Sequence, residues 1–206
     1  PQGLRLRQVQ IGDLPLYNQD DDADPHASVR RLKSEIASAH GFEGVRMRAV
    51  AARAGTAASA LYRHYASKTH LLVTVLAREF ERLDTEFVWS TGELAPQARL
   101  GRLTTHLHTA WQANPHLTEA MVRAFVVADT EATSAIEHAV AVIEDMLARA
   151  LGGPTPSAHD RDVASLIADV WLANLIAVIG GRIDADLARE RIDRTTRQLV
   201  HGTHTT

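Results

Sequence analysis

The chain has no cysteine among its 206 residues, and this absence excludes several classes of protein. A disulfide framework, a cysteine-ligated zinc site and a thiol nucleophile all require the missing side chain. We find no signal-peptide core near the start and no run of the roughly 18 to 20 apolar residues that span a bilayer. We therefore expect a soluble, cytoplasmic protein without a membrane partner.

Enzyme signatures are missing as well. The chain has neither a glycine-rich phosphate loop nor the G-x-S-x-G turn that carries a serine nucleophile. Its eleven histidines include the pair His106 and His108, but residues two apart point to different sides of a helix. No third ligand stands at helical spacing from that pair. We therefore expect no metal site, no cofactor and no enzymatic activity.

Alternation typical of β-strands is also scarce, whereas helical periodicity covers most of the chain. Breakers such as Asn114-Pro115, the run 152–156 and Gly180-Gly181 separate the periodic segments. The pattern predicts an all-α protein with helices over residues 27–39, 47–54, 57–64, 67–89, 98–114, 117–128, 133–151, 158–180 and 184–200.

The charge of the chain is unevenly distributed. The net charge is -3, yet residues 29–82 hold ten Lys or Arg against four Asp or Glu, a local balance of +6. The rest of the chain therefore carries -9. Such asymmetry concentrates attraction for a polyanion such as DNA at one end of the molecule.

Within this basic region, residues 41–76 have the pattern of a helix-turn-helix. Two short amphipathic helices flank Gly55, and a longer helix begins at Ser67, which can cap it. In such a unit the second helix enters the major groove and the first braces against the backbone. A small helical subdomain with ordinary surface arginines is the alternative interpretation.

The exposed positions of this unit suit DNA. Cationic side chains flank the turn, and hydroxyl and imidazole groups that suit phosphate oxygens follow it. Small side chains on the second helix can contact thymine methyl groups, with Ala57, Ala58 and Ala60 as candidates. The predicted DNA-binding residues are Arg46, Arg48, Ala58, Ser59, Tyr62, Arg63, His64 and Lys68.

The same residues resemble a known family. The segments AVAARAG, ALYRHY and SKTHLL, between Met47 and Leu72, are similar to the DNA-binding signature of the TetR family of transcriptional repressors. Ala57 and Ala60 depart from it, because the family usually has a capping Ser or Thr at the first position and often Thr at the second. The resemblance implies a three-helix DNA-binding head followed by a helical effector-binding and dimerisation domain, and double-stranded operator DNA as partner.

On this basis we divide the chain into four parts. These are a flexible N-terminal arm (1–26), a helix-turn-helix domain (27–72), an effector-binding and dimerisation domain (73–200) and a C-terminal tail (201–206). The segment 158–180 is apolar almost all round, and such a helix must be covered on every face. We interpret the last two helices as a four-helix interface of a homodimer, with burial inside one monomer as the alternative.

A set of large apolar residues is interspersed with alanines between residues 98 and 179. Periodicity alone favours solid core packing, whereas the family resemblance implies a pocket for a small hydrophobic effector. The predicted ligand-binding residues are Leu103, Leu107, Trp111, Met121, Phe125, Met146, Trp171 and Asn174. We expect Arg99, Arg102 or Arg123 to receive anionic groups at the pocket mouth.

Two further segments, LTEAMVRAFVVAD (117–129) and DVWLANLIAVI (169–179), resemble a subgroup of the family, the actinobacterial repressors of sterol catabolism. This resemblance implies a ligand-responsive repressor of sterol or lipid catabolism genes, released from DNA by a steroid acyl-CoA. The alternative is a multidrug- or fatty acyl-CoA-responsive repressor of efflux or fatty-acid genes.

Overall fold

The computed structural model describes residues 41–89 and 94–202. The predicted arm (1–26), the first predicted helix (27–39) and residues 203–206 lie outside this range. Within it, every element is helical, which confirms the all-α prediction. The elements are η2 (Phe42–Gly44), α2 (Met47–Arg53), α3 (Ala58–His64), α4 (Lys68–Glu86), α5 (Pro96–Ala113), α6 (Pro115–Val126), η3 (Thr130–Ala132), α7 (Thr133–Gly152), α8 (Ala158–Ile179) and α9 (Ala185–Gly202).

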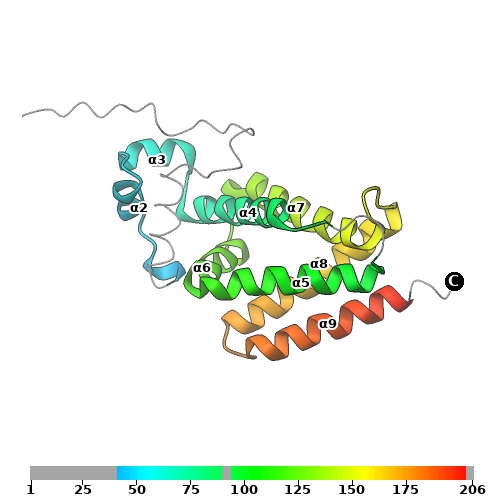
Figure 1. The fold of residues 1–206 in the computed structure, drawn as a ribbon. Helices are drawn as coiled ribbons and strands as arrows, with labels where there is room; N and C mark the ends of the chain where they lie inside the picture. The colour runs from blue at the N-terminus through cyan, green and yellow to red at the C-terminus, as the bar shows by residue number, and fades with distance from the viewer. Residues whose placement is uncertain (1–40, 90–93, 203–206) are drawn as a thin grey trace, which may run out of the picture.

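Helix α4 connects the two halves of the molecule. Figure 1 shows α2 and α3 at one end, beside the first turn of α4, while the rest of α4 runs into the larger helical domain. There α4 packs along α7 and α6. Its apolar face is fully covered, with Leu71, Leu72 and Val73 at 0% exposure. At about 1.5 Å per residue its 19 residues span roughly 28 Å.

The predicted boundaries hold within two residues for most helices. Proline is tolerated in the first turn of a helix, where its missing N–H has no intrahelical partner, and α5 and α6 accordingly begin at Pro96 and Pro115. The prediction for α4 was wrong at its far end. The helix ends at Glu86, and Phe87 is already extended, with φ -74° and ψ 124°.

Helix α8 corrects the expectation that no segment is long and apolar enough to cross a bilayer. Its 22 residues include a window with a mean hydropathy of 1.8, so among the described helices this one qualifies by length and composition. Only 22% of that window is buried, although α8 contacts α6, α7 and α9. Much of its apolar surface is therefore uncovered in a single chain.

Candidate DNA-binding head and effector pocket

The turn of the helix-turn-helix is formed by Gly55. Its φ of +72° lies in the left-handed region that favours glycine, and the Thr56 N–H donates to the Ala51 carbonyl at 2.9 Å to close α2. Val50 and Leu61, 1% and 4% exposed, pack between the two short helices. The predicted turn is thus confirmed.

The predicted DNA-binding residues divide into an exposed set and an engaged set. The exposed set is Arg48, Ser59, Tyr62, Arg63 and His64. The guanidinium of Arg46 is also exposed but donates to the Glu43 carbonyl. Ala58 is half-buried against the apolar core of the head.

Two other alanines of α3 were considered for base contacts. Ala60 is 5% exposed, so the idea that it touches thymine methyl groups is wrong. Ala57 is the N-cap of α3, and it supplies no side-chain hydrogen bond to the helix. The first amides of α3 are therefore left without the hydroxyl cap that is usual in the family.

Lys68 has an internal partner that the sequence did not reveal. Its ammonium donates to the Phe42 carbonyl at 3.0 Å and lies 3.8 Å from the centre of the Phe42 ring. Partial burial, which disfavours the charged form, lowers the pKa of Lys68 from its usual value. The same stretch contains the predicted cap, since the Ser67 hydroxyl accepts from the His70 N–H at 3.1 Å. The first turn of α4 is thus held by the Lys68 bond to Phe42 and by the Ser67 cap.

A second connection between head and body comes from α6. The Phe42 N–H donates to the Glu119 carboxylate at 2.6 Å, and Arg123 pairs with the other Glu119 oxygen at 2.7 Å. Gly41 beside it has φ +86°, and a Cβ added there would lie 2.3 Å from Glu119. The carboxylate therefore sits in a space that glycine leaves open.

The larger domain contains a cavity of about 90 Å³. Five helices, α4 to α8, contribute its walls. The lining residues are Leu76, Phe80, Trp111, Val122, Phe125, Ala139, Val140, Ile143, Glu144, Ala168, Asp169, Trp171, Leu172 and Leu175. Because Leu76 and Phe80 belong to α4, the cavity wall and the entry to the head share one helix.

The predicted ligand-binding set is only partly brought together. Trp111, Phe125 and Trp171 line the cavity. Four others are packed solidly in the core instead, each at most 2% exposed; these are Leu103, Leu107, Met121 and Met146. Asn174 does not line the cavity either, and its amide donates to the Val170 carbonyl of its own helix at 2.8 Å.

None of the three arginines predicted at the mouth lines this cavity. Arg99 donates to the Ala150 carbonyl at 2.8 Å and to the Leu151 carbonyl, so it caps the end of α7. Arg123 is paired with Glu119, and Arg102 lines a separate open groove near the end of α4. The charged groups on the cavity are the carboxylates of Glu144 and Asp169.

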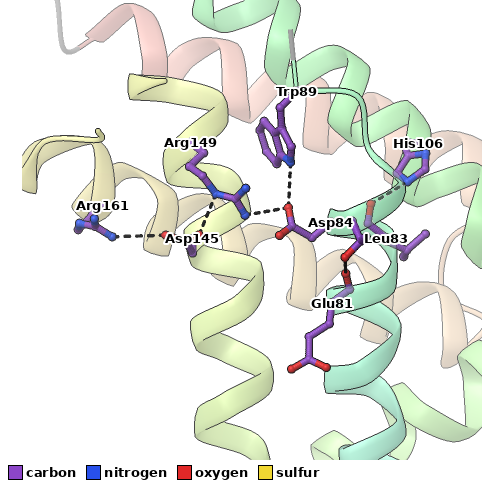
Figure 2. A network of polar contacts seen from close by, with 9 residues as sticks. Glu81, Leu83, Asp84, Trp89, His106, Asp145, Arg149 and Arg161 are labelled. Atoms are coloured by element: carbon purple, nitrogen blue, oxygen red, sulfur yellow. Dashed lines mark hydrogen bonds and ion pairs between the residues drawn. The ribbon is translucent and has the colours of Figure 1, made fainter. Parts of the chain in front are cut away.

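The far end of α4 is fastened to α7 by a polar network, shown in Figure 2. Asp84 accepts from the Trp89 indole at 3.0 Å and from Arg149 at 2.7 Å. The Arg149 guanidinium also lies 4.4 Å from the Trp89 ring and bonds Asp145 at 2.8 Å. Trp89 folds back on this network, which explains why α4 stops before it.

Comparison with known proteins agrees with this architecture. Residues 34–75 match the family described as "Bacterial regulatory proteins, tetR family", and residues 93–199 match "Tetracyclin repressor-like, C-terminal domain". A TetR transcriptional regulator from Rhodococcus sp. RHA1 has the same fold, with a TM-score of 0.73 at 23% identity over 84% of this chain and 94% of that one.

Curated relatives are closer in sequence. The HTH-type transcriptional repressor KstR of Mycolicibacterium smegmatis is 44% identical over 80% of this chain and 81% of its own length. KstR of Mycobacterium tuberculosis is 43% identical over 80% and 76%, and that of Rhodococcus jostii is 38% identical over 88% of each. The chain therefore belongs to the TetR family of transcriptional regulators and is a KstR-like repressor.

Proposed function

We propose that this protein represses transcription by binding operator DNA as a homodimer and is released by a lipid-like effector, most simply a steroid acyl-CoA. The target genes would serve sterol or lipid catabolism. The sterol assignment is supported by the KstR relatives and by the resemblance of residues 117–129 and 169–179 to sterol-responsive repressors. The protein acts on DNA and so in the cytoplasm.

The observation that carries the proposal is the position of the cavity on α4. Its volume of about 90 Å³ is well below the roughly 300 to 1,000 Å³ of pockets that enclose a drug-sized ligand. A steroid must therefore separate the surrounding helices in order to enter. Because Leu76 and Phe80 form part of the wall, this expansion displaces the helix that carries the DNA-binding head.

Release then depends on which arrangement the ligand prefers. A ligand shifts the equilibrium only by its difference in affinity for the DNA-competent and the expanded states. A hundredfold loss of operator affinity requires a coupling free energy of about 2.7 kcal/mol. The compact, DNA-competent state has too little room for the ligand, whereas the expanded state accommodates it. The ligand therefore binds the expanded state more tightly, and this difference in affinity supplies the coupling free energy.

The dimer is supported by the uncovered surface of α8. Leu166 is 52% exposed and Leu187 of α9 is 36% exposed, and only 22% of the apolar window of α8 is buried. Asp169 at the middle of α8 makes lipid a costly cover for this helix. A second copy of the chain, with α8 and α9 of both chains forming four helices, is the cover that we propose instead.

A second candidate effector is a hydrophobic cation. The cavity is lined by four aromatic side chains and by the carboxylates of Glu144 and Asp169, a combination that attracts cations. The same carboxylates disfavour phosphates at the edge formed by α7 and α8. A steroid acyl-CoA would therefore extend its CoA portion from another edge of the cavity.

The test is a ligand panel against the repressor bound to a duplex that it selects from random-sequence DNA. The ligands are 3-oxo-5β-cholan-24-oyl-CoA, the corresponding free acid, palmitoyl-CoA, free CoA and the cation rhodamine 6G, and release is followed by fluorescence anisotropy. We expect release by the steroid thioester. Release by palmitoyl-CoA alone would assign the protein to fatty-acid control, and release by rhodamine 6G alone would support the second candidate.

A further inference from the structure

The indole N–H of Trp171 is a buried donor without an acceptor. Trp171 is 3% exposed and lines the cavity from α8. Its Nε1 has no hydrogen-bond partner in the part of the chain that the structure describes. The Trp89 indole, by contrast, donates to Asp84 at 3.0 Å, as buried indoles usually do.

Such an orphan donor is costly in a free protein. A buried donor without a partner costs about 1 to 3 kcal/mol, and phenylalanine would fill much of the same space without that cost. The ring of Trp111 lies edge-to-face with Trp171 at 6.1 Å between centroids and 84° between planes. That contact contributes packing, but a hydrogen bond to an aromatic face is much weaker than one to an oxygen.

We propose that Trp171 is a specificity-determining residue whose N–H donates to an oxygen atom of the effector, such as a ring ketone. This inference rests on the proposed function in taking the cavity as the effector site. The neighbouring walls, formed by Phe80, Trp111, Phe125 and Leu175, are apolar. A ligand oxygen placed near Trp171 can therefore accept a hydrogen bond from its indole, and Phe80, Phe125 and Leu175 offer it no other donor.

The hydrogen-bonding roles of the polar groups at the cavity limit which ligand group can face Trp171. An indole N–H only donates, and an ionised carboxylate only accepts. A ketone only accepts, so it can pair with Trp171 but not with Glu144 or Asp169. A ligand with a ketone facing α8 should therefore bind more tightly than the same ligand without that oxygen. One neutral hydrogen bond corresponds to a roughly 5- to 10-fold difference in affinity.

The direct test uses a small ketone of a size comparable to the cavity. Cyclohexanone and its hydrocarbon isostere methylenecyclohexane are titrated into the full-length protein while the ¹⁵N-indole resonances are recorded. The chain has three tryptophans, and Trp171→Phe assigns the relevant signal. We expect cyclohexanone to move the Trp171 N–H proton downfield and methylenecyclohexane not to do so. An equal response to both probes, or a response to neither, overturns the proposal.

The second test measures specificity with 3-oxo-5β-cholan-24-oyl-CoA and 5β-cholan-24-oyl-CoA, which differ in the ring ketone. The wild-type protein should bind the 3-oxo compound roughly 5- to 10-fold more tightly than the compound without the ketone. Trp171→Phe should abolish this preference and should still bind the compound without the ketone. Trp89→Phe, at a tryptophan outside the cavity lining, is the matched control and should keep the preference. A preference that survives in Trp171→Phe contradicts the assignment.

The two tests separate this inference from the proposed function. If neither thioester releases DNA but cyclohexanone shifts the Trp171 signal, the steroid assignment fails and the donor role of Trp171 stands. If both thioesters release DNA equally from the wild-type protein, the effector class stands and the role of Trp171 falls.

Discussion

The carboxylate of Glu119 on α6 accepts a hydrogen bond of 2.6 Å from the backbone N–H of Phe42, at the start of the DNA-binding head. The same helix contributes Val122 and Phe125 to the cavity wall. Cavity and head are therefore joined along two helices, α4 and α6. We therefore expect a ligand that moves α6 to displace Phe42 and the segment that leads into the helix-turn-helix.

Removing this connection should uncouple the ligand from DNA release. In Glu119→Ala the thioester that releases the wild-type protein should still bind, but the ratio of operator affinities without and with ligand should fall several-fold. The reason is that a charge-assisted hydrogen bond contributes about 1.5 to 3 kcal/mol, and this one is half-exposed and therefore at the lower end. Glu137→Ala, at an exposed site on α7, is the control. An unchanged ratio in Glu119→Ala would remove Glu119 from the coupling.

Gly41 and Gly55 form a matched pair for testing the space occupied by Glu119. Both have positive φ, +86° and +72°, but an added Cβ at Gly41 meets the Glu119 carboxylate at 2.3 Å whereas nothing lies within 4 Å of one at Gly55. Alanine costs about 1 to 2 kcal/mol for a left-handed backbone, and about 1 to 3 kcal/mol at Gly41, whose φ of +86° and ψ of -171° lie in a region that only glycine adopts readily. We expect Gly41→Ala to lower the free energy of unfolding by more than Gly55→Ala does. Equal losses in denaturant unfolding would show that the carboxylate moves aside freely.

Two cations of the head should differ in their effects. Arg63 is exposed, so Arg63→Ala should reduce the salt dependence of operator binding by about one unit with little change in melting temperature. Lys68→Ala should reduce it similarly and also lower the melting temperature, because it removes the bond to the Phe42 carbonyl. A salt dependence unaffected by Lys68→Ala would restrict Lys68 to its internal role.

A charge on the uncovered face of α8 should split the dimer. Val178→Asp places a carboxylate in the proposed interface, where an unpaired buried charge costs several kcal/mol. Val88→Asp is the matched control, since Val88 is 71% exposed and lies beyond the end of α4. Sedimentation should show a wild-type dimer, a Val178→Asp monomer and a Val88→Asp dimer. A wild-type protein that is monomeric at micromolar concentration would exclude the interface.

The sequence predicted local features well because they depend on neighbouring residues. The Gly55 turn and the Ser67 cap follow from backbone and side-chain preferences within a few positions. The end of α4 does not, because the apolar pattern continues through Phe87, and the partners that hold Trp89 in its folded-back position are Asp84 and the distant Arg149. Arg99 was misassigned for the same reason: the carbonyls that it caps lie 51 and 52 residues away.

The cavity was predicted least completely. Periodicity identifies the buried face of each helix, but a face can meet other side chains, as at Met121, or a hollow, as at Phe125. Leu76 and Phe80 line the cavity but were not among the predicted ligand-binding residues. The choice between the two depends on how five helices pack together, which no single stretch of sequence specifies.

The central claim, that a ligand inside this cavity releases DNA, is tested most directly by filling the cavity. Ala168 lines it, and Ala168→Phe adds a ring of comparable size, while Ala141→Phe adds the same ring at an exposed position on α7. Operator affinity is measured with and without 3-oxo-5β-cholan-24-oyl-CoA. The account predicts that Ala168→Phe binds the operator but is no longer released, whereas Ala141→Phe is released like the wild-type protein. Undiminished release of Ala168→Phe would contradict it.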